Sequence, residues 1–294
     1  MLRIASGFAL ACVLVSMTSH AADAATTAYL AARDKAVATF KVANLEDPKT
    51  DERIQASLQT LQGMMQGIVG PIRLQGFPPK GSYYVDTLTD EEGYGKLDGM
   101  AVGSSDEKSF ALITTLPLLR DWLDHSSDIP KPSTSTGVDG LAGVFTSETF
   151  YTEAFSDDAH YYKYAELPVA QGTSGVARAI LFTSAQDDPA PSPPDGILVA
   201  VVNGERVVLL RKSWTAPDIP ECAAAYREAN KKADAALSAY HASKLADKAK
   251  FDQFGDLREK ANGAFLQCYA QRLPSVAAYA SLVHEAQSMV DLVK

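Results

Sequence analysis

The chain has 294 residues and carries 27 Lys and Arg against 36 Asp and Glu, which gives it a net charge of −9. Phosphate backbones and anionic lipid surfaces attract proteins through clustered Lys and Arg, so an acidic chain argues against nucleic acid and anionic membranes as partners. The length is sufficient for a sizeable hydrophobic core, in one composite domain or in two.

The first 21 residues have the layout of a secretory signal peptide. A short basic start precedes an apolar run over Ile4–Met17, and small residues, Ser19 and Ala21, occupy the −3 and −1 positions of a cleavage site before Ala22. A transmembrane anchor is the weaker alternative, because the run is too short to span a bilayer comfortably. We therefore expect removal of residues 1–21 and a periplasmic or secreted mature chain, without stable insertion in a membrane.

Residues 22–71 are predicted to form an N-terminal helical segment. A first helix is expected over Thr26–Val42, and a second begins near Asp47 or Thr50. Apolar residues recur in the second helix at steps of four and three, which places them on one helix face. The members of this stripe are Ile54, Leu58, Leu61, Met65 and Ile68.

Residues 72–216 form the predicted antiparallel β region, in which short β-branched and aromatic runs alternate with Gly, Pro and Ser. One short helix, Leu116–Asp124, interrupts the strands. The first six expected strands are Ser82–Val85, Met100–Val102, Phe110–Thr114, Gly143–Phe155, Tyr161–Leu167 and Val176–Thr183.

The last two strands of the β region form a predicted hairpin, Ile197–Val202 followed by Glu205–Lys212. Asn203-Gly204 lies between them and supplies the positive φ angles of a type I′ turn. Because Val199–Val202 is apolar on both faces, we expect this strand to be central in the sheet and covered by helices on both sides.

Residues 217–294 are predicted to be helical and contain Cys222 and Cys268, the two cysteines that remain after signal-peptide removal. Each cysteine lies on an apolar stripe at helical spacing, so a turn near Leu245–Asp252 lets the two sulfurs meet. An even pair in an oxidising compartment favours a bridge, and we expect a Cys222–Cys268 disulfide. Two buried, reduced thiols are the alternative.

Helices at both ends of the chain and strands between them indicate an α+β fold. We expect an antiparallel β-sheet flanked by N-terminal and C-terminal helices that pack together. The sequence shows no internal repeat and no heptad run long enough for an extended coiled coil.

The sequence contains no local motif for catalysis, a cofactor or a metal. The P-loop, the dinucleotide fingerprint and the Gly-x-Ser-x-Gly elbow are missing, and no histidine has a metal-binding spacing. The acidic run that ends at Asp98 lacks the alternating spacing of a calcium loop. We therefore expect no cofactor and no metal. If catalytic residues converge from separate segments, His125 or His160 is the expected base.

Tyrosines gather in the β region. In Phe150-Tyr151 and Tyr161-Tyr162, adjacent residues on a strand point to opposite faces, so one of each pair faces away from a core on one side of the sheet. Exposed tyrosines suit protein recognition, although tyrosine is also simply a good strand former. The candidate partner surface comprises Tyr83, Tyr84, Tyr151, Tyr161 and Tyr162.

The leading hypothesis is a non-catalytic envelope factor that binds another envelope protein, as an inhibitor, immunity or accessory protein does. An acidic binder suits a basic partner, because complementary charge speeds association. The alternatives are an envelope hydrolase with dispersed catalytic residues and an envelope structural or assembly factor.

Overall fold

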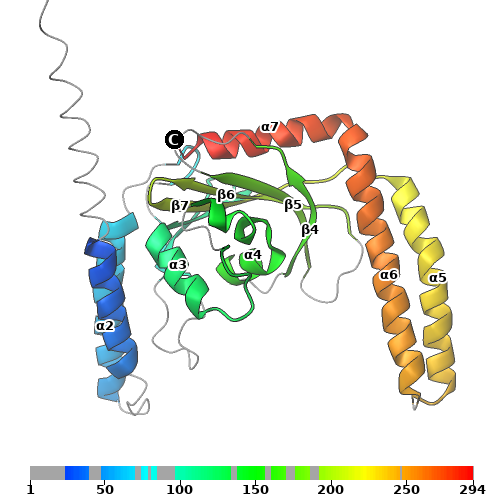
Figure 1. The fold of residues 1–294 in the computed structure, drawn as a ribbon, viewed down its shortest axis with the longest axis horizontal. Coiled ribbons are helices and arrows are strands. Elements are labelled where there is room, and N and C mark those ends of the chain that lie inside the picture. The colour runs from blue at the N-terminus through cyan, green and yellow to red at the C-terminus, as the bar shows by residue number, and fades with distance from the viewer. Residues whose placement is uncertain are drawn as a thin grey trace, which may run out of the picture.

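A computed structural model describes residues 24–39, 48–69, 74–78, 81–84, 97–133, 138–155, 160–169, 176–185, 192–245 and 247–293. The expected signal peptide and most of the acidic run before Asp98 lie outside these residues. Figure 1 shows a sheet with helices on both faces and a pair of long helices that projects from one side. The predicted α+β class is confirmed.

The centre of the fold is a seven-stranded antiparallel sheet with the order β1-β2-β3-β7-β6-β5-β4. Every neighbouring pair in it is antiparallel. The strands are β1 Ser82–Tyr84, β2 Gly99–Gly103, β3 Ser109–Thr115, β4 His160–Leu167, β5 Ala177–Ala185, β6 Gly196–Asn203 and β7 Arg206–Ser213.

Both faces of the sheet are buried, and the side chains of each central strand alternate between two cores. In β7, Val208 and Leu210 belong to one core and Val207 and Leu209 to the other. All but the last residue of β6 are buried, which confirms the predicted central strand. A strand that is apolar at every position is stable here because helices cover it on both sides.

One core lies under the helices at the two ends of the chain, and the other lies under short helices from the middle. Residues 24–39 form the first helix on the terminal face. The other helices on that face are α2 Pro48–Val69, α5 Pro220–Ala242, α6 Lys248–Arg272 and α7 Ala277–Asp291, with the turn η3 Leu273–Ser275 before α7. The opposite face carries α3 Leu116–His125, η1 Val138–Leu141, η2 Val144–Thr146 and α4 Glu148–Phe155.

The terminal helices do not form one bundle. Figure 1 places α2 and the α5–α6 pair at opposite sides of the sheet, with α7 lying across it. Helix α2 packs on β1, β2 and β3, whereas α6 reaches β4 at the other edge. The N-terminal and C-terminal helices both contribute side chains to the same apolar core on this face of the sheet. They pack together through this core.

The strand predicted over Gly143–Phe155 is wrong, since this segment forms η2 and α4. Its aromatic and β-branched residues favour a strand locally. The buried residues of α4 are Phe150, Tyr151 and Ala154, a spacing that places them on one helix face. Packing against the sheet therefore overrides the local strand preference.

The β6–β7 hairpin is confirmed, but its turn differs from the predicted one. Asn203 pairs with Arg206, so the two loop residues are Gly204 and Glu205. Among these residues only Gly204 has a positive φ, of 64°. Glycine at the first loop position is the pattern of a type II′ turn, which also matches the twist of the strands.

A buried ionic cluster fixes the first helix to the sheet. The guanidinium of Arg33 donates to Asp98 at 3.1 Å and to Asp121 of α3 at 2.6 Å, and the Tyr29 hydroxyl donates to Asp98 at 2.9 Å. Burial lowers the pKa of Arg33, but the hydrogen bonds and charges of Asp121 and Asp98 outweigh it, so the pKa rises. Asp98, the last residue of the acidic run, is thus a structural counter-ion.

The predicted disulfide is present and closes the base of an antiparallel helix pair. Cys222 and Cys268 are bonded, with Cα atoms 5.5 Å apart. The connection between α5 and α6 spans residues 243–247, so each cysteine lies twenty residues from the adjacent helix end. The two helices run side by side away from the sheet (Figure 1), and we call α5, α6 and their connection the arm.

Candidate functional site

The far end of the arm exposes two large apolar side chains. Leu245 is 57% exposed and Phe251 is 50% exposed, and they are the exposed large hydrophobic residues of the described chain. Leu245 lies in the connection and Phe251 in the first turn of α6. We call this end of the arm, residues 240–254, the tip.

Aromatic contacts hold Phe251 at the surface of the tip. Its ring centroid lies 5.2 Å from that of Tyr240 and 6.3 Å from that of Phe254. The Tyr240 hydroxyl donates to the carbonyl of Leu245 at 3.2 Å. The tip is therefore an ordered surface with one aromatic and one aliphatic side chain directed to solvent.

The backbone at the tip is in an unfavourable conformation. Lys244 and Leu245 have φ angles of 56° and 62°, in the left-handed region. This region is costly for side chains with a Cβ, and glycine or asparagine usually occupies it. A helix-to-helix connection that served only folding would use glycine at these positions.

The charges at the tip are largely paired within it. Lys248 binds Asp252 at 2.7 Å, and Lys250 binds Asp247 at 3.2 Å. Asp247 also caps α6, and its hydrogen bonds with Lys250 hold its pKa below the usual range. The two pairs flank the apolar side chains without giving the tip a large net charge.

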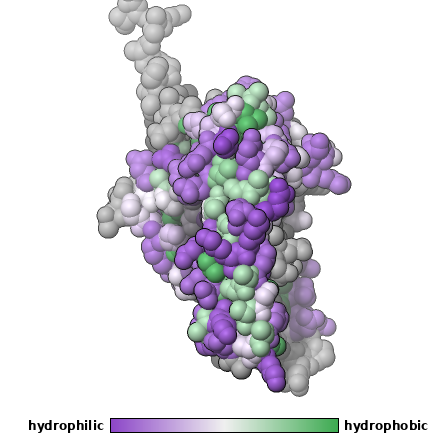
Figure 2. Space-filling view, turned by 90° about the vertical axis from the view of Figure 1, so that its right-hand side faces the viewer, coloured by the Kyte–Doolittle hydropathy of each residue, from purple (hydrophilic) through white to green (hydrophobic). Residues whose placement is uncertain are grey.

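In Figure 2 the outer side of the arm faces the viewer and shows a narrow strip of weakly apolar side chains between hydrophilic ones. Helix α5 also carries several exposed alanines. They are Ala224, Ala225, Ala235, Ala239 and Ala242. We call the part of the arm between the disulfide and the tip the shaft. Within α5 only Cys222 and Ala233 are buried, so the shaft leaves most of its surface in solvent.

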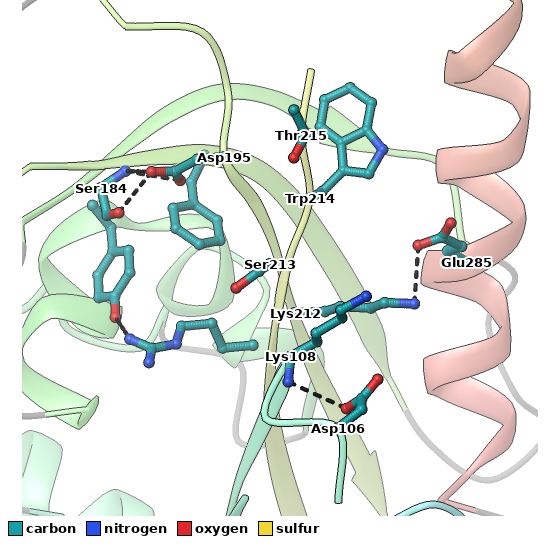
Figure 3. Close-up of a pocket in the computed structure, with 12 residues that line it drawn as sticks. Asp106, Lys108, Ser184, Asp195, Lys212, Ser213, Trp214, Thr215 and Glu285 are labelled. Atoms are coloured by element: carbon teal, nitrogen blue, oxygen red, sulfur yellow. Dashed lines mark hydrogen bonds and ion pairs between the residues drawn. The ribbon is translucent and has the colours of Figure 1, made fainter. Parts of the chain in front are cut away.

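A second feature is a cleft of about 740 Å³ where β7 ends and β6 begins, beside α7 (Figure 3). Successive residues of β7 point to opposite faces of the sheet. Arg211 therefore lies on the α4 face, and Lys212 on the α7 face, where it binds Glu285 at 3.1 Å. We call this hollow the strand-end cleft.

The wall on the α4 face is aromatic. Arg211 donates to the Tyr161 hydroxyl at 2.5 Å, and its guanidinium carbon lies 5.8 Å from the ring centroids of both Phe110 and Phe155. Tyr161 and Phe182 are buried and form the floor. On the other side the half-buried Trp214 borders the cleft.

The structure does not support one exposed tyrosine surface. Tyr151 and Tyr161 are buried, at 0% and 1% exposure, because helices cover both faces of the sheet. Burial also raises the pKa of Tyr151, whose hydroxyl donates to the Phe145 carbonyl at 2.9 Å. Tyr162 is half-buried on β4.

The remaining two tyrosines, Tyr83 and Tyr84, belong to β1 at the opposite edge of the sheet from β4, and their side chains lie outside the described part. The sequence pattern placed all five residues on strands, whereas Tyr151 lies in helix α4. The covering of both sheet faces, which Val199–Val202 indicated, was not applied to these tyrosines.

The two histidines considered as bases lie at exposed positions outside the strand-end cleft. His125 ends α3, where its Nδ1 lies 2.7 Å from the Asp121 carbonyl oxygen, and His160 begins β4. Asp157 and Asp158, the acids closest to His160 in sequence, lie outside the described residues. Within the described ranges no group of three His, Cys, Asp or Glu side chains is placed to hold a metal.

In the described part of the chain, no helix has the length and apolar character needed to cross a bilayer. Comparisons with protein-family models, with curated proteins and with solved structures find no match. The arm tip and the strand-end cleft are thus the features from which a function can be argued.

Proposed function

We propose that this protein is an exported, non-catalytic binding factor of the bacterial envelope that contacts a protein partner with the tip of its arm. The observation that carries the proposal is the exposure of Leu245 and Phe251 at the end of a projecting, disulfide-closed helix pair. Apolar side chains at the centre of a protein contact contribute much of its affinity.

Packing within the tip accounts for only part of the surface of these two side chains. Burying a Leu or Phe side chain fully contributes about 1.5–3 kcal/mol, and about half of this contribution is lost at the tip, where Leu245 is 57% and Phe251 50% exposed. Leu245 in addition occupies a left-handed conformation that disfavours it. Strain at an exposed position supports a functional role, because selection for stability alone would remove it.

The paired charges favour a protein partner over a lipid surface. Attachment to anionic lipid depends on basic side chains that can face the headgroups. At the tip, Lys248 and Lys250 are already bound to Asp252 and Asp247. Alternating charges around an apolar centre instead resemble the polar rim of a protein interface.

The charge of the arm differs from that of the body. Residues 220–272 contain nine Lys and Arg against seven Asp and Glu, a net charge of +2, whereas the whole chain has −9, which leaves −11 elsewhere. We therefore expect the surface that receives the tip to be an apolar pocket whose rim carries charges of both signs, to match the two ion pairs of the tip. This differs from the basic partner suggested by the overall charge.

The test compares three forms of the mature protein as affinity baits for envelope extract of the source organism. They are the wild type, the tip variant Leu245→Gly/Phe251→Ser, and the shaft variant Ala225→Arg, which changes an exposed residue of α5 fifteen residues before the tip. We expect one protein to be retained by the wild type and the shaft variant and lost by the tip variant. That protein is then purified, and its affinity for the tip variant should be at least about tenfold weaker, because apolar burial is removed.

Two results would contradict the proposal. One is equal affinity of the purified partner for the wild type and the tip variant. The other is co-sedimentation of the wild type, but not of the tip variant, with phosphatidylglycerol vesicles in the absence of any protein partner, which would make the arm a membrane anchor.

A further inference from the structure

The strand-end cleft has the size of a small-molecule site, and its charges balance. Its volume of about 740 Å³ lies within the range of roughly 300–1,000 Å³ that ligand pockets occupy. Among the described lining residues, three acidic side chains stand against three basic ones. They are Asp106, Asp195 and Glu285 against Lys108, Arg211 and Lys212. A balanced cleft favours an uncharged ligand, because it attracts neither sign of charge over the other.

Several of these charged groups hold the walls of the cleft together. The Arg211 guanidinium is engaged by the Tyr161 hydroxyl and by aromatic rings. Asp195 accepts the backbone N–H of Ser184 at 3.0 Å and the Ser184 hydroxyl at 2.7 Å, which joins β5 to the residue before β6. An ionic ligand would have to compete with these contacts, whereas an uncharged ligand leaves them intact.

Lys212 and Glu285 form a polar wall on the α7 side of the cleft. The Nζ atom of Lys212 lies 3.1 Å from the Glu285 carboxylate, and the two side chains are 31% and 33% exposed. Packing therefore restricts both groups while solvent still reaches them. An ammonium group and a carboxylate can each form several hydrogen bonds, so one contact between them does not exhaust their capacity. The wall offers a donor and an acceptor side by side.

Trp214 supplies an aromatic surface next to this wall. It is half-buried, packs against the core of the terminal face and borders the cleft. Its backbone N–H donates to the Asp195 carbonyl at 2.7 Å, which fixes the segment in place. Lys212 and Trp214 are two residues apart on extended chain, so both point to the same face of the sheet, roughly 7 Å from each other. Figure 3 shows the indole and the Lys212–Glu285 pair on the α7 side of β7.

An aromatic ring beside a donor–acceptor pair matches the chemistry of a sugar. A pyranose with equatorial hydroxyl groups has C–H groups on its two faces and hydroxyls around its rim. The C–H groups carry a small positive charge, which the negative face of an aromatic ring attracts. Each hydroxyl both donates and accepts a hydrogen bond, so it can bind an ammonium and a carboxylate together.

We propose that the strand-end cleft binds an uncharged saccharide built of such pyranoses, with one ring against Trp214 and its hydroxyls on Lys212 and Glu285. This site is independent of the tip of the arm, so either can fail without the other. Glucose and N-acetylglucosamine units share the required chemistry, and the experiment distinguishes them.

The experiment titrates cellotriose and N,N′,N″-triacetylchitotriose into the mature protein and records heat and tryptophan fluorescence. Glycerol is the control, because it has hydroxyls but no ring face. The other tryptophan, Trp122, is buried at 3% exposure, so a fluorescence change reports mainly on Trp214. We expect saturable binding of at least one trisaccharide and none of glycerol, and the tighter trisaccharide identifies the preferred sugar unit.

Variants locate the site by calorimetry. Trp214→Leu keeps an apolar side chain against the core but removes the aromatic face, so it should weaken binding at least about tenfold. Glu285→Ala removes a charged acceptor and should also weaken binding about tenfold. Glu228→Ala is the matched control, because it breaks an exposed Lys–Glu pair on the arm, and it should bind as the wild type does.

The proposal is overturned if neither trisaccharide binds saturably or if glycerol binds as well as they do. Equal affinities of Glu285→Ala and Glu228→Ala would also overturn it. This comparison holds even if Trp214→Leu fails to fold, since Glu285 lies at the surface. A folded Trp214→Leu protein with unchanged affinity would exclude stacking on the indole.

Discussion

The sheet body and the arm are stabilised by different means. In the body, β6 is buried at all but its last position and an ion pair within the core fixes the first helix. In the arm, α5 buries two residues and a disulfide closes the base. Burial in the core explains nearly every apolar residue of the body but few of those in the arm. An apolar residue that burial does not explain is therefore stronger evidence of a binding role when it lies in the arm.

The largest expected effect is in the body. Arg33→Met removes the guanidinium and leaves Asp98, which is 3% exposed, without its buried counter-charge. Breaking one partner of a buried ion pair costs about 3–5 kcal/mol, so the free energy of unfolding should fall by this amount in urea titrations. Lys248→Met, which breaks an exposed pair in the arm, is the control and should change little. A similar loss for both variants would remove the distinction.

Loss of the disulfide should affect mainly the arm. With 45 residues between the cysteines, the Cys222→Ala/Cys268→Ala protein should lose about 2–4 kcal/mol of stability. Hydrogen exchange should accelerate in α5 and α6, while amides of β6 and β7 retain the greatest protection. Equal acceleration in sheet and arm would show that the two unfold as one unit.

Glycine-to-alanine replacements should have opposite signs in the two regions. A Cβ at Gly196 would lie 2.3 Å from the Phe182 ring and 2.9 Å from the Lys212 carbonyl, so Gly196→Ala should cost about 1–3 kcal/mol. A Cβ at Gly255 or Gly263 of α6 meets nothing within 4 Å. There alanine should stabilise by up to about 1 kcal/mol, because it favours the helix. Melting temperatures measure both, and destabilisation by Gly263→Ala would contradict the open arm surface.

The smallest expected effect is at the tip. Leu245→Gly relieves a left-handed conformation but makes the unfolded chain more flexible, so the net gain should be at most about 1 kcal/mol. Measuring both the stability of this variant and its partner binding shows whether Leu245 contributes to folding or to recognition. A clear loss of stability would show that Leu245 serves folding and would remove the main support for the proposed contact.

The parts of the fold that follow from local spacing were predictable. The stripe from Ile54 to Ile68, the β6–β7 hairpin and the pairing of Cys222 with Cys268 all depend on periodicity or on short separations along one element. The segment with Phe150 and Tyr151 was not predictable in this way, because its aromatic residues favour a strand and only packing on the sheet makes it helical.

The candidate sites were harder to predict from the sequence than the fold. Leu245 and Phe251 were placed at a turn between two helices, but no pattern in the sequence indicated that these helices leave the body. The strand-end cleft joins residues from β4, β5, β7 and α7 that are far apart in the chain. Two groups of lining residues are close in sequence, Asp106 with Lys108 and Arg211 to Thr215, but neither group indicates a cleft by itself.

One hydroxyl ties the base of the arm to the segment that precedes it. Tyr269 of α6 accepts the backbone N–H of Ile219 at 3.2 Å and donates to the Pro217 carbonyl at 3.3 Å, immediately before α5 begins. With 23 residues, α5 extends about 35 Å, so a rotation of about 10° at this junction displaces the tip by about 6 Å. A small change at this junction therefore moves the tip by several ångströms, and the two hydrogen bonds of Tyr269 contribute to the position of Leu245.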